Sequence, residues 1–254
     1  MRWIISTNTK PSLLPYLLPA LRPLLFAAGS LLVLCLPSFR GRDLNAVAPW
    51  WPLICIAVNL ITLAVLYRIV KKEGRSLRSL LGKRKDASSR RKEIPIAIAL
   101  MLVLGLGGLW GFSTLIYGRM PVDGIQPLPV WAALIVLIFL PLSVVLSELP
   151  LYLGYCAAGI RETTGKSRFA VIYPLFFYAL QHSFIPLLFD VRHMVSRFLI
   201  FVPLLIMIGI WYERKRDLLP LMIGHGVLDL FTGIQLLIVS LDPSIYDMMR
   251  SAAG

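Results

Sequence analysis

The chain has 254 residues, of which 57% are hydrophobic, and its mean hydropathy is +0.77; an ordinary globular domain is only about 45–50% apolar. Several apolar runs reach the roughly 20 residues that cross a bilayer, which excludes a water-soluble fold. The 26 Lys and Arg residues against 13 Asp and Glu give a net charge of +13, but they cluster between apolar runs, as in the loops of membrane proteins, so nucleic acid is not expected as a partner.

In chain order, the apolar runs predict an all-α, polytopic transmembrane helix bundle of about seven spans. The first run contains Arg22 and four prolines, and its length and internal charge favour a retained span over a removed signal peptide. We expect N-terminal helices with a basic loop in 1–93, a core in 94–240 and a tail in 241–254. The expected spans are 13–37, 46–67, 94–117, 128–159, 169–189, 198–212 and 218–239.

The basic residues predict how the chain is oriented in its membrane. With seven spans, the side of the N-terminus collects 20 of the 26, including 11 between residues 68 and 92, and the other side collects six. Because Lys and Arg are retained on the cytoplasmic side, the N-terminus is expected in the cytoplasm of a cell whose cytoplasmic membrane holds the protein. Membrane lipids are therefore expected partners.

Few acidic residues and histidines fall inside the predicted spans, and these are the candidate functional residues, because intramembrane charge is costly and is usually functional. They are Glu148, His182, His225 and Asp229, whereas His193 falls in the predicted 190–197 loop. At a helical rise of about 1.5 Å per residue, the four lie roughly 10–20 Å from the inner ends of their spans. We expect them to meet in one cavity that opens towards the cytoplasmic half of the membrane.

The residue types suggest a hydrolytic site. His225 and Asp229 are four residues apart, so they share one helix face. Two imidazoles and two carboxylates suit water activation by a general base. The same four side chains would also suffice to hold a catalytic zinc ion with an open water position, so zinc is the candidate cofactor.

Three segments in order resemble the motifs of the CPBP intramembrane proteases, the CAAX-processing and bacteriocin-processing family, whose pattern is EExxxR, FxxxH and HxxxN or HxxxD. Glu148 lies in SELPLYLGY, Tyr178 and His182 lie in FFYALQHSF, and His225 and Asp229 lie in RDLLPLMIGHGVLDL. The third motif matches fully, and Tyr178 stands where the second has Phe. The resemblance covers roughly residues 128–239, and the basic segment GRSLRSLLGKRK also resembles the loop that precedes the family's core.

The first motif departs from this pattern, and two registers are open. If Gly154 is the glycine that often follows the motif, Leu149 replaces the second Glu and Leu153 replaces the Arg. This register is preferred, because losing both charges together is less costly than losing one of them. In the other register, Ser147 takes the first Glu position and Tyr152 the Arg position, and the glycine match is lost.

The resemblance implies an intramembrane endopeptidase that hydrolyses a peptide bond of a peptide or protein substrate. Carried over, Glu148 would be the general base, His182 its partner on the water, and His225 with Asp229 the residues that stabilise the oxyanion or help to hold a metal. The departures in the first motif keep a second class open: an inactive membrane protein that binds a peptide or bacteriocin or acts as an immunity factor, or a small transporter that uses the same polar cluster.

Overall fold

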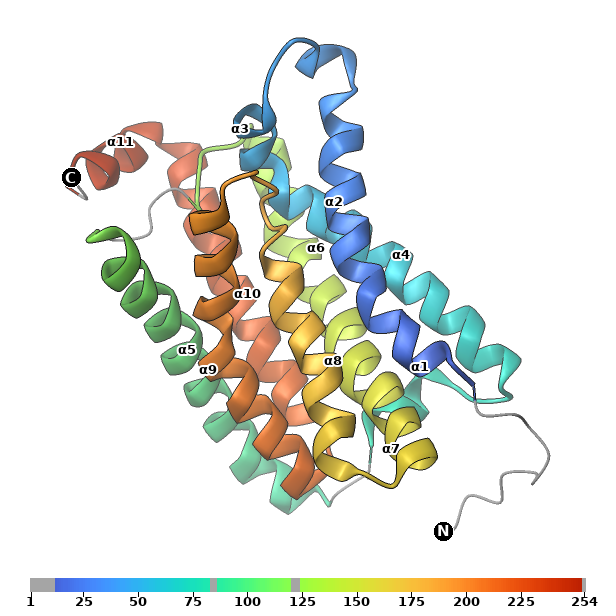
Figure 1. Ribbon diagram of the computed structural model, residues 1–254. Coiled ribbons are helices and arrows are strands. Elements are labelled where there is room, and N and C mark those ends of the chain that lie inside the picture. Colours follow the sequence, from blue (N-terminus) through green and yellow to red (C-terminus); the bar gives the residue numbers. More distant parts are fainter. Residues whose placement is uncertain (1–11, 83–85, 120–123, 253–254) are drawn as a thin grey trace.

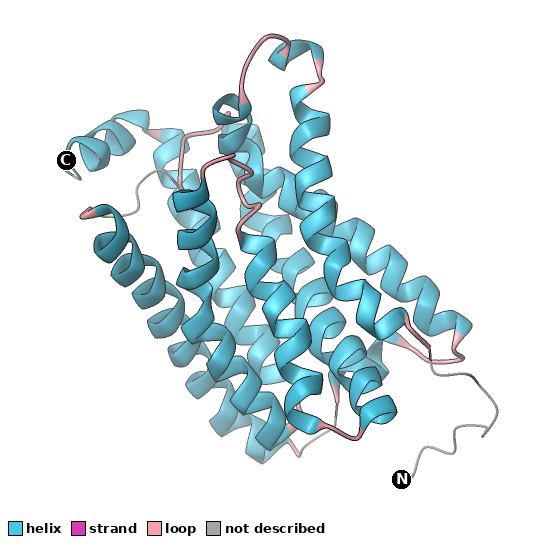
Figure 2. Cartoon of the chain, in the orientation of Figure 1, coloured by secondary structure: helices cyan, strands magenta, loops and turns pink. Residues whose placement is uncertain are grey.

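The computed structural model describes residues 12–82, 86–119 and 124–252 (Figure 1). Every regular element in this part of the chain is helical (Figure 2). The elements are α1 (Leu14–Leu17), η1 (Leu18–Ala20), α2 (Leu21–Leu34), η2 (Pro37–Phe39), α3 (Leu44–Val47), η3 (Ala48–Trp50), α4 (Trp51–Lys72), η4 (Leu77–Leu81), α5 (Ala87–Tyr117), α6 (Val130–Leu149), η5 (Pro150–Ala157), α7 (Ala158–Thr164), α8 (Ser167–His182), α9 (Val191–Lys215), α10 (Leu219–Leu241) and α11 (Pro243–Ala252).

The expected polytopic all-α bundle is confirmed. Six helical segments of the described chain are long and apolar enough to cross a membrane: Leu14–Leu34, Leu44–Lys72, Ser88–Tyr117, Val130–Thr164, Val191–Lys215 and Leu219–Leu241. The remaining expected span, 169–189, is the shorter helix α8, which ends at His182 and continues as an irregular segment. Large apolar side chains such as Leu24, Val103 and Leu142 are exposed on the outside of the bundle, as expected for helices that face lipid.

Helix α9 is longer than the sequence indicates. The expected span covered 198–212, because Arg192, His193 and Arg197 lower the hydropathy before it, but the helix begins at Val191. Asp190 caps it, since its carboxylate accepts hydrogen bonds from the backbone N–H groups of Arg192 at 2.8 Å and His193 at 3.3 Å. The expectation of a loop over 190–197 was therefore wrong, and His193 lies in the first turn of α9.

The centre of the bundle is formed by α6 and α10, which pack together, with α4 against α6 and α5 against α10. Small residues allow this close approach, as is usual between membrane helices. A Cβ atom on Gly233 of α10 would lie 3.0 Å from Leu137 Cα of α6, and one on Gly224 would lie 2.9 Å from the Ala97 carbonyl oxygen of α5. Helix α9 packs against α5 and α8, and α2 packs against α4 and α8.

The bundle has two different ends. Helix α1, the C-terminal ends of α4, α7 and α9, and η4 lie at one end, which we call the basic end, and α11 lies at the other, which we call the distal end (Figure 1). At the basic end, η4 is not a free loop: Leu80 is buried, and a Cβ atom on Gly154 would lie only 2.5 Å from its carbonyl oxygen. Nearby, the guanidinium of Arg90 donates two hydrogen bonds to the fully buried carboxylate of Asp217.

Candidate functional site

Glu148 lies at the last turn of α6, directly before a change in helix type. Pro150 cannot donate a backbone hydrogen bond, and the next eight residues, Pro150–Ala157, form a π-helix before α7 resumes an α-helix. Wide π turns of this kind often mark functional sites. The Glu148 side chain is turned into the bundle and is only 4% exposed.

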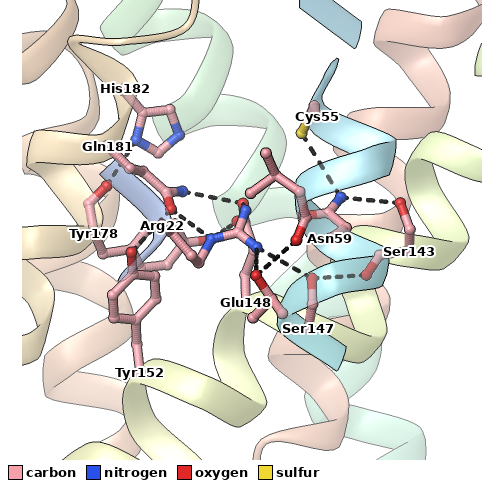
Figure 3. A network of polar contacts seen from close by, with 12 residues as sticks. Arg22, Cys55, Asn59, Ser143, Ser147, Glu148, Tyr152, Tyr178, Gln181 and His182 are labelled. Carbon is pink, nitrogen blue, oxygen red and sulfur yellow. Dashed lines mark hydrogen bonds and ion pairs between the residues drawn. The ribbon is translucent and has the colours of Figure 1, made fainter. Parts of the chain in front are cut away.

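The closest partner of Glu148 is Arg22, which sequence reasoning missed. Arg22 Nη2 lies 2.5 Å from Glu148 Oε1, although the two residues are 126 positions apart (Figure 3). The Arg22 side chain is fully buried. The sequence indicated only that Arg22 is a charge within the first span; in the structure it lies inside the bundle as the counter-ion of Glu148. Its sequence signal was the single charge inside the apolar run 13–37.

Gln181 and Tyr152 complete the surroundings of the Arg22 guanidinium. Arg22 Nε donates to Gln181 Oε1 at 2.7 Å, and the Tyr152 hydroxyl donates to the same oxygen at 2.9 Å. The Gln181 amide in turn donates to Glu148 Oε1 at 3.0 Å. Arg22 Nη1 also lies 3.5 Å from Ser147 Oγ. The network therefore satisfies a buried arginine, which would be costly to leave unpaired.

This network bears on the two registers of the first motif. Ser147 and Tyr152, the motif positions in the second register, both face the polar network. Leu149 and Leu153, the replaced positions in the preferred register, are buried in the apolar core instead. The arginine beside Glu148 is therefore supplied by α2, and neither leucine contributes to the site.

The second oxygen of Glu148 faces helices α8 and α10. The Tyr178 hydroxyl donates a hydrogen bond to Glu148 Oε2 at 2.6 Å, and the same hydroxyl lies 3.3 Å from His225 Nδ1. His225 Nε2 lies 3.8 Å from Glu148 Oε2 and 3.5 Å from Asp229 Oδ2. His225 and Asp229 thus share one face of α10, as their spacing indicated. No hydrogen bond from the described residues reaches Asp229 Oδ2.

His182 lies beside this cluster rather than on Glu148. Its Nδ1 lies 2.8 Å from the Tyr178 carbonyl oxygen, which can only accept, so Nδ1 carries the proton of this hydrogen bond. Its ring stacks on Phe201 with 3.6 Å between the ring centroids, and Tyr178 stacks against it at 5.7 Å. The sequence prediction of one common site is therefore met most closely by Glu148, His225 and Asp229, with His182 as a neighbour.

All four candidate residues line one cavity of about 570 Å³, a size typical of ligand sites. From these residues the cavity extends to the distal end, where it is lined by Asn45, Gly124, Gln126, Pro186, Asp190 and Arg250. No described residue of the basic end is among its lining residues. The cavity that we expect to open towards the cytoplasmic half of the membrane thus extends to the distal end of the bundle and away from the basic end. Towards that end, η4 and α7 pack against η5, whose eight residues are all buried.

The donor set does not fit a zinc ion as it is arranged. Both oxygens of Glu148 already accept hydrogen bonds, and the Arg22 guanidinium on Oε1 would repel a cation. His182 Nδ1 is also engaged. Among the described residues, no three His, Cys, Asp or Glu side chains form a group that could hold a metal ion.

Comparison with known proteins does not assign the chain to a family: no family model, curated protein or solved structure matches it.

Proposed function

We propose that this protein is an intramembrane endopeptidase of the CPBP type in which Glu148 activates the attacking water. The observation that carries the proposal is the meeting of Glu148, His225 and Asp229 on the wall of one cavity, with neighbouring atoms within 4 Å. These side chains come from α6 and α10, and such ionisable groups inside a membrane protein usually mark a functional site.

In the proposed reaction, Glu148 Oε2 takes a proton from water, the oxygen attacks the peptide carbonyl carbon, and the C–N bond breaks as the proton passes to the leaving amine. The Tyr178 hydroxyl occupies Oε2 in the present arrangement. Water activation therefore requires this hydroxyl to turn away, and His225 Nδ1 at 3.3 Å is the alternative acceptor. With Nδ1 accepting from Tyr178, the proton of the neutral His225 imidazole is on Nε2. This N–H would then stabilise the oxyanion, with Asp229 Oδ2 3.5 Å from the same nitrogen. His182 would position the substrate at the cavity wall.

We expect the substrate to be a peptide or protein segment that enters from the distal end. The charge asymmetry of the sequence favours a cytoplasmic basic end and N-terminus in the cytoplasmic membrane. Under that orientation the cavity faces away from the cytoplasm, so the substrate would approach from the outer side. Lipids would surround the apolar outer face of the helices.

Glu148→Gln tests the proposal, because it removes the base and keeps the side-chain shape. With a pool of quenched fluorogenic peptides and purified protein, we expect turnover to fall by roughly 10²–10⁴-fold, as is typical of lost acid–base catalysis. Glu162→Gln, which changes an exposed glutamate outside the cavity, is the matched control and should keep full turnover. Equal turnover in wild type and Glu148→Gln would exclude Glu148 as the base.

One observation favours a second candidate, a non-catalytic binding protein or a small transporter. Arg22, Gln181 and Tyr178 engage both oxygens of Glu148, as in a purely structural ion pair. Such a protein would bind peptides, or carry a solute, with no product formed by the wild type. Absence of any cleaved peptide, together with binding that survives Glu148→Gln, would select this candidate.

The proposed reaction uses no zinc ion, and the zinc content of the protein can be tested separately. Because the donors are arranged as hydrogen-bonding partners, we expect purified protein to contain much less than one zinc ion per chain. One zinc ion per chain, lost in His225→Ala, would overturn this expectation and return zinc to the mechanism.

A further inference from the structure

Arg197 is a charged residue of the cavity that the proposed reaction does not use. It lies on α9, lines the cavity and is half-buried. Its Nε donates to the Ile185 carbonyl oxygen at 2.9 Å, and its guanidinium lies 5.3 Å from the ring centre of Phe201. These two contacts fix the plane of the guanidinium.

No carboxylate in the described part of the chain forms an ion pair with Arg197, in contrast to Arg22, which is paired with Glu148. Asp190, the acidic lining residue directly before α9, caps the N-terminus of this helix with its carboxylate. A half-buried arginine without a counter-ion is costly in a membrane protein, and such residues are usually retained for a function. Binding an anion is one such function. Since Arg197 borders the cavity, its counter-ion can come from a ligand.

Arg197 is also close to the proposed reaction centre. Phe201 contacts both Arg197 and His182, whose ring stacks on it, so one aromatic layer connects the guanidinium to the site. The charges of the cavity are unevenly distributed: Glu148 and Asp229 lie at its inner part, whereas three arginines, Arg119, Arg197 and Arg250, and one carboxylate, Asp190, line the part nearer the distal end. A ligand with a negative group on the distal side would complement this arrangement.

We propose that Arg197 is an oxyanion-binding subsite that selects peptides carrying an acidic side chain close to the segment held at Glu148. A guanidinium binds a carboxylate through two parallel hydrogen bonds, and such charge-assisted pairs are stronger than neutral ones. The peptide nature of the ligand rests on the proposed function, whereas the anion preference rests on Arg197 itself.

Binding of two fluorescein-labelled peptide pools tests this inference without requiring turnover. Both pools are amidated apolar heptapeptides, one with a central Glu and one with a central Gln, and binding is followed by fluorescence polarisation with wild type and Glu148→Gln. We expect the Glu pool to bind roughly tenfold more tightly or better. Arg197→Gln should bring the ratio close to one, and Arg197→Lys should retain part of it, because lysine keeps the charge without the bidentate geometry.

Arg192→Gln is the matched control, because Arg192 lies on the same helix, is exposed and does not line the cavity; it should leave the ratio unchanged. An equal affinity of the two pools for wild type, or a ratio that survives Arg197→Gln, would overturn the inference. If the pools bind alike while inorganic phosphate or phosphatidylglycerol raises the Tm of wild type but not of Arg197→Gln, the subsite takes a phosphate and the peptide assignment is wrong.

The same experiment separates this inference from the proposed function. Selective binding of the Glu pool with no cleavage would leave the subsite intact and refute the endopeptidase. Cleavage of both pools at equal rates and equal affinity would support the endopeptidase and refute the subsite.

Discussion

Replacing Arg22 by methionine should strongly destabilise the protein, because it leaves the carboxylate of Glu148 buried without its counter-ion. The two side chains are 0% and 4% exposed, and their charged atoms are 2.5 Å apart. Removing one partner of such a pair costs about 3–5 kcal/mol. At roughly 2–4 °C per kcal/mol for a chain of this size, Tm should fall by roughly 6–20 °C.

The double variant distinguishes a coupled pair from two independent effects. Arg22→Met with Glu148→Gln removes both charges, and replacing both partners of a buried pair is often close to neutral. The double variant should therefore be more stable than the sum of the two single effects indicates, with a coupling energy on the order of 1–3 kcal/mol. Glutamine at position 148 also keeps polar atoms for Tyr178 and Gln181.

Thermal unfolding in detergent at one fixed scan rate, followed by the fluorescence of the six tryptophans, measures these shifts. Arg40→Met is the matched control, since Arg40 is exposed. Surface substitutions usually change stability by no more than about 0.5 kcal/mol, so the Tm of this variant should stay close to that of the wild type. A drop of less than about 2 °C in Arg22→Met, or single effects that add in the double variant, would refute the reasoning that this ion pair holds α2 to the site.

Two further predictions concern topology and packing. The exposed Cys35 of the distal end should react with a membrane-impermeant thiol reagent from outside the cell, whereas a cysteine placed at the exposed Ser76 in a Cys35→Ser background should react only from the cytoplasm; the reverse pattern would invert the orientation. Gly154→Ala should lower stability by about 1–3 kcal/mol, because its Cβ would lie 2.5 Å from the Leu80 carbonyl oxygen. Gly107→Ala has open space and should be neutral or stabilising in the same thermal assay.

The apolar runs were sufficient to predict a helical, polytopic membrane protein, because the length of a run and its helical hydrogen bonds are local properties of the chain. The pairing of His225 with Asp229 was predictable for the same reason, since residues four apart share a helix face. The similar distances of Glu148, His225 and Asp229 from the inner ends of their spans indicated that the three lie at a common depth. The N-terminal extension of α9 was missed, because its polar residues, of which His193, Ser196 and Arg197 line the cavity, lower the hydropathy on which the prediction depended.

The tertiary structure decided which residues become partners across the bundle. The first motif implied that the arginine beside Glu148 is lost with Leu153, yet Arg22 supplies it from a helix 126 positions away. Nothing in the local pattern specifies such a pair, because its energy depends on the packing of α2 beside α6 and α8. The direction of the cavity also depends on packing between distant segments: η4 and α7 pack against the buried η5 towards the basic end, whereas the cavity that reaches Glu148 extends to the distal end.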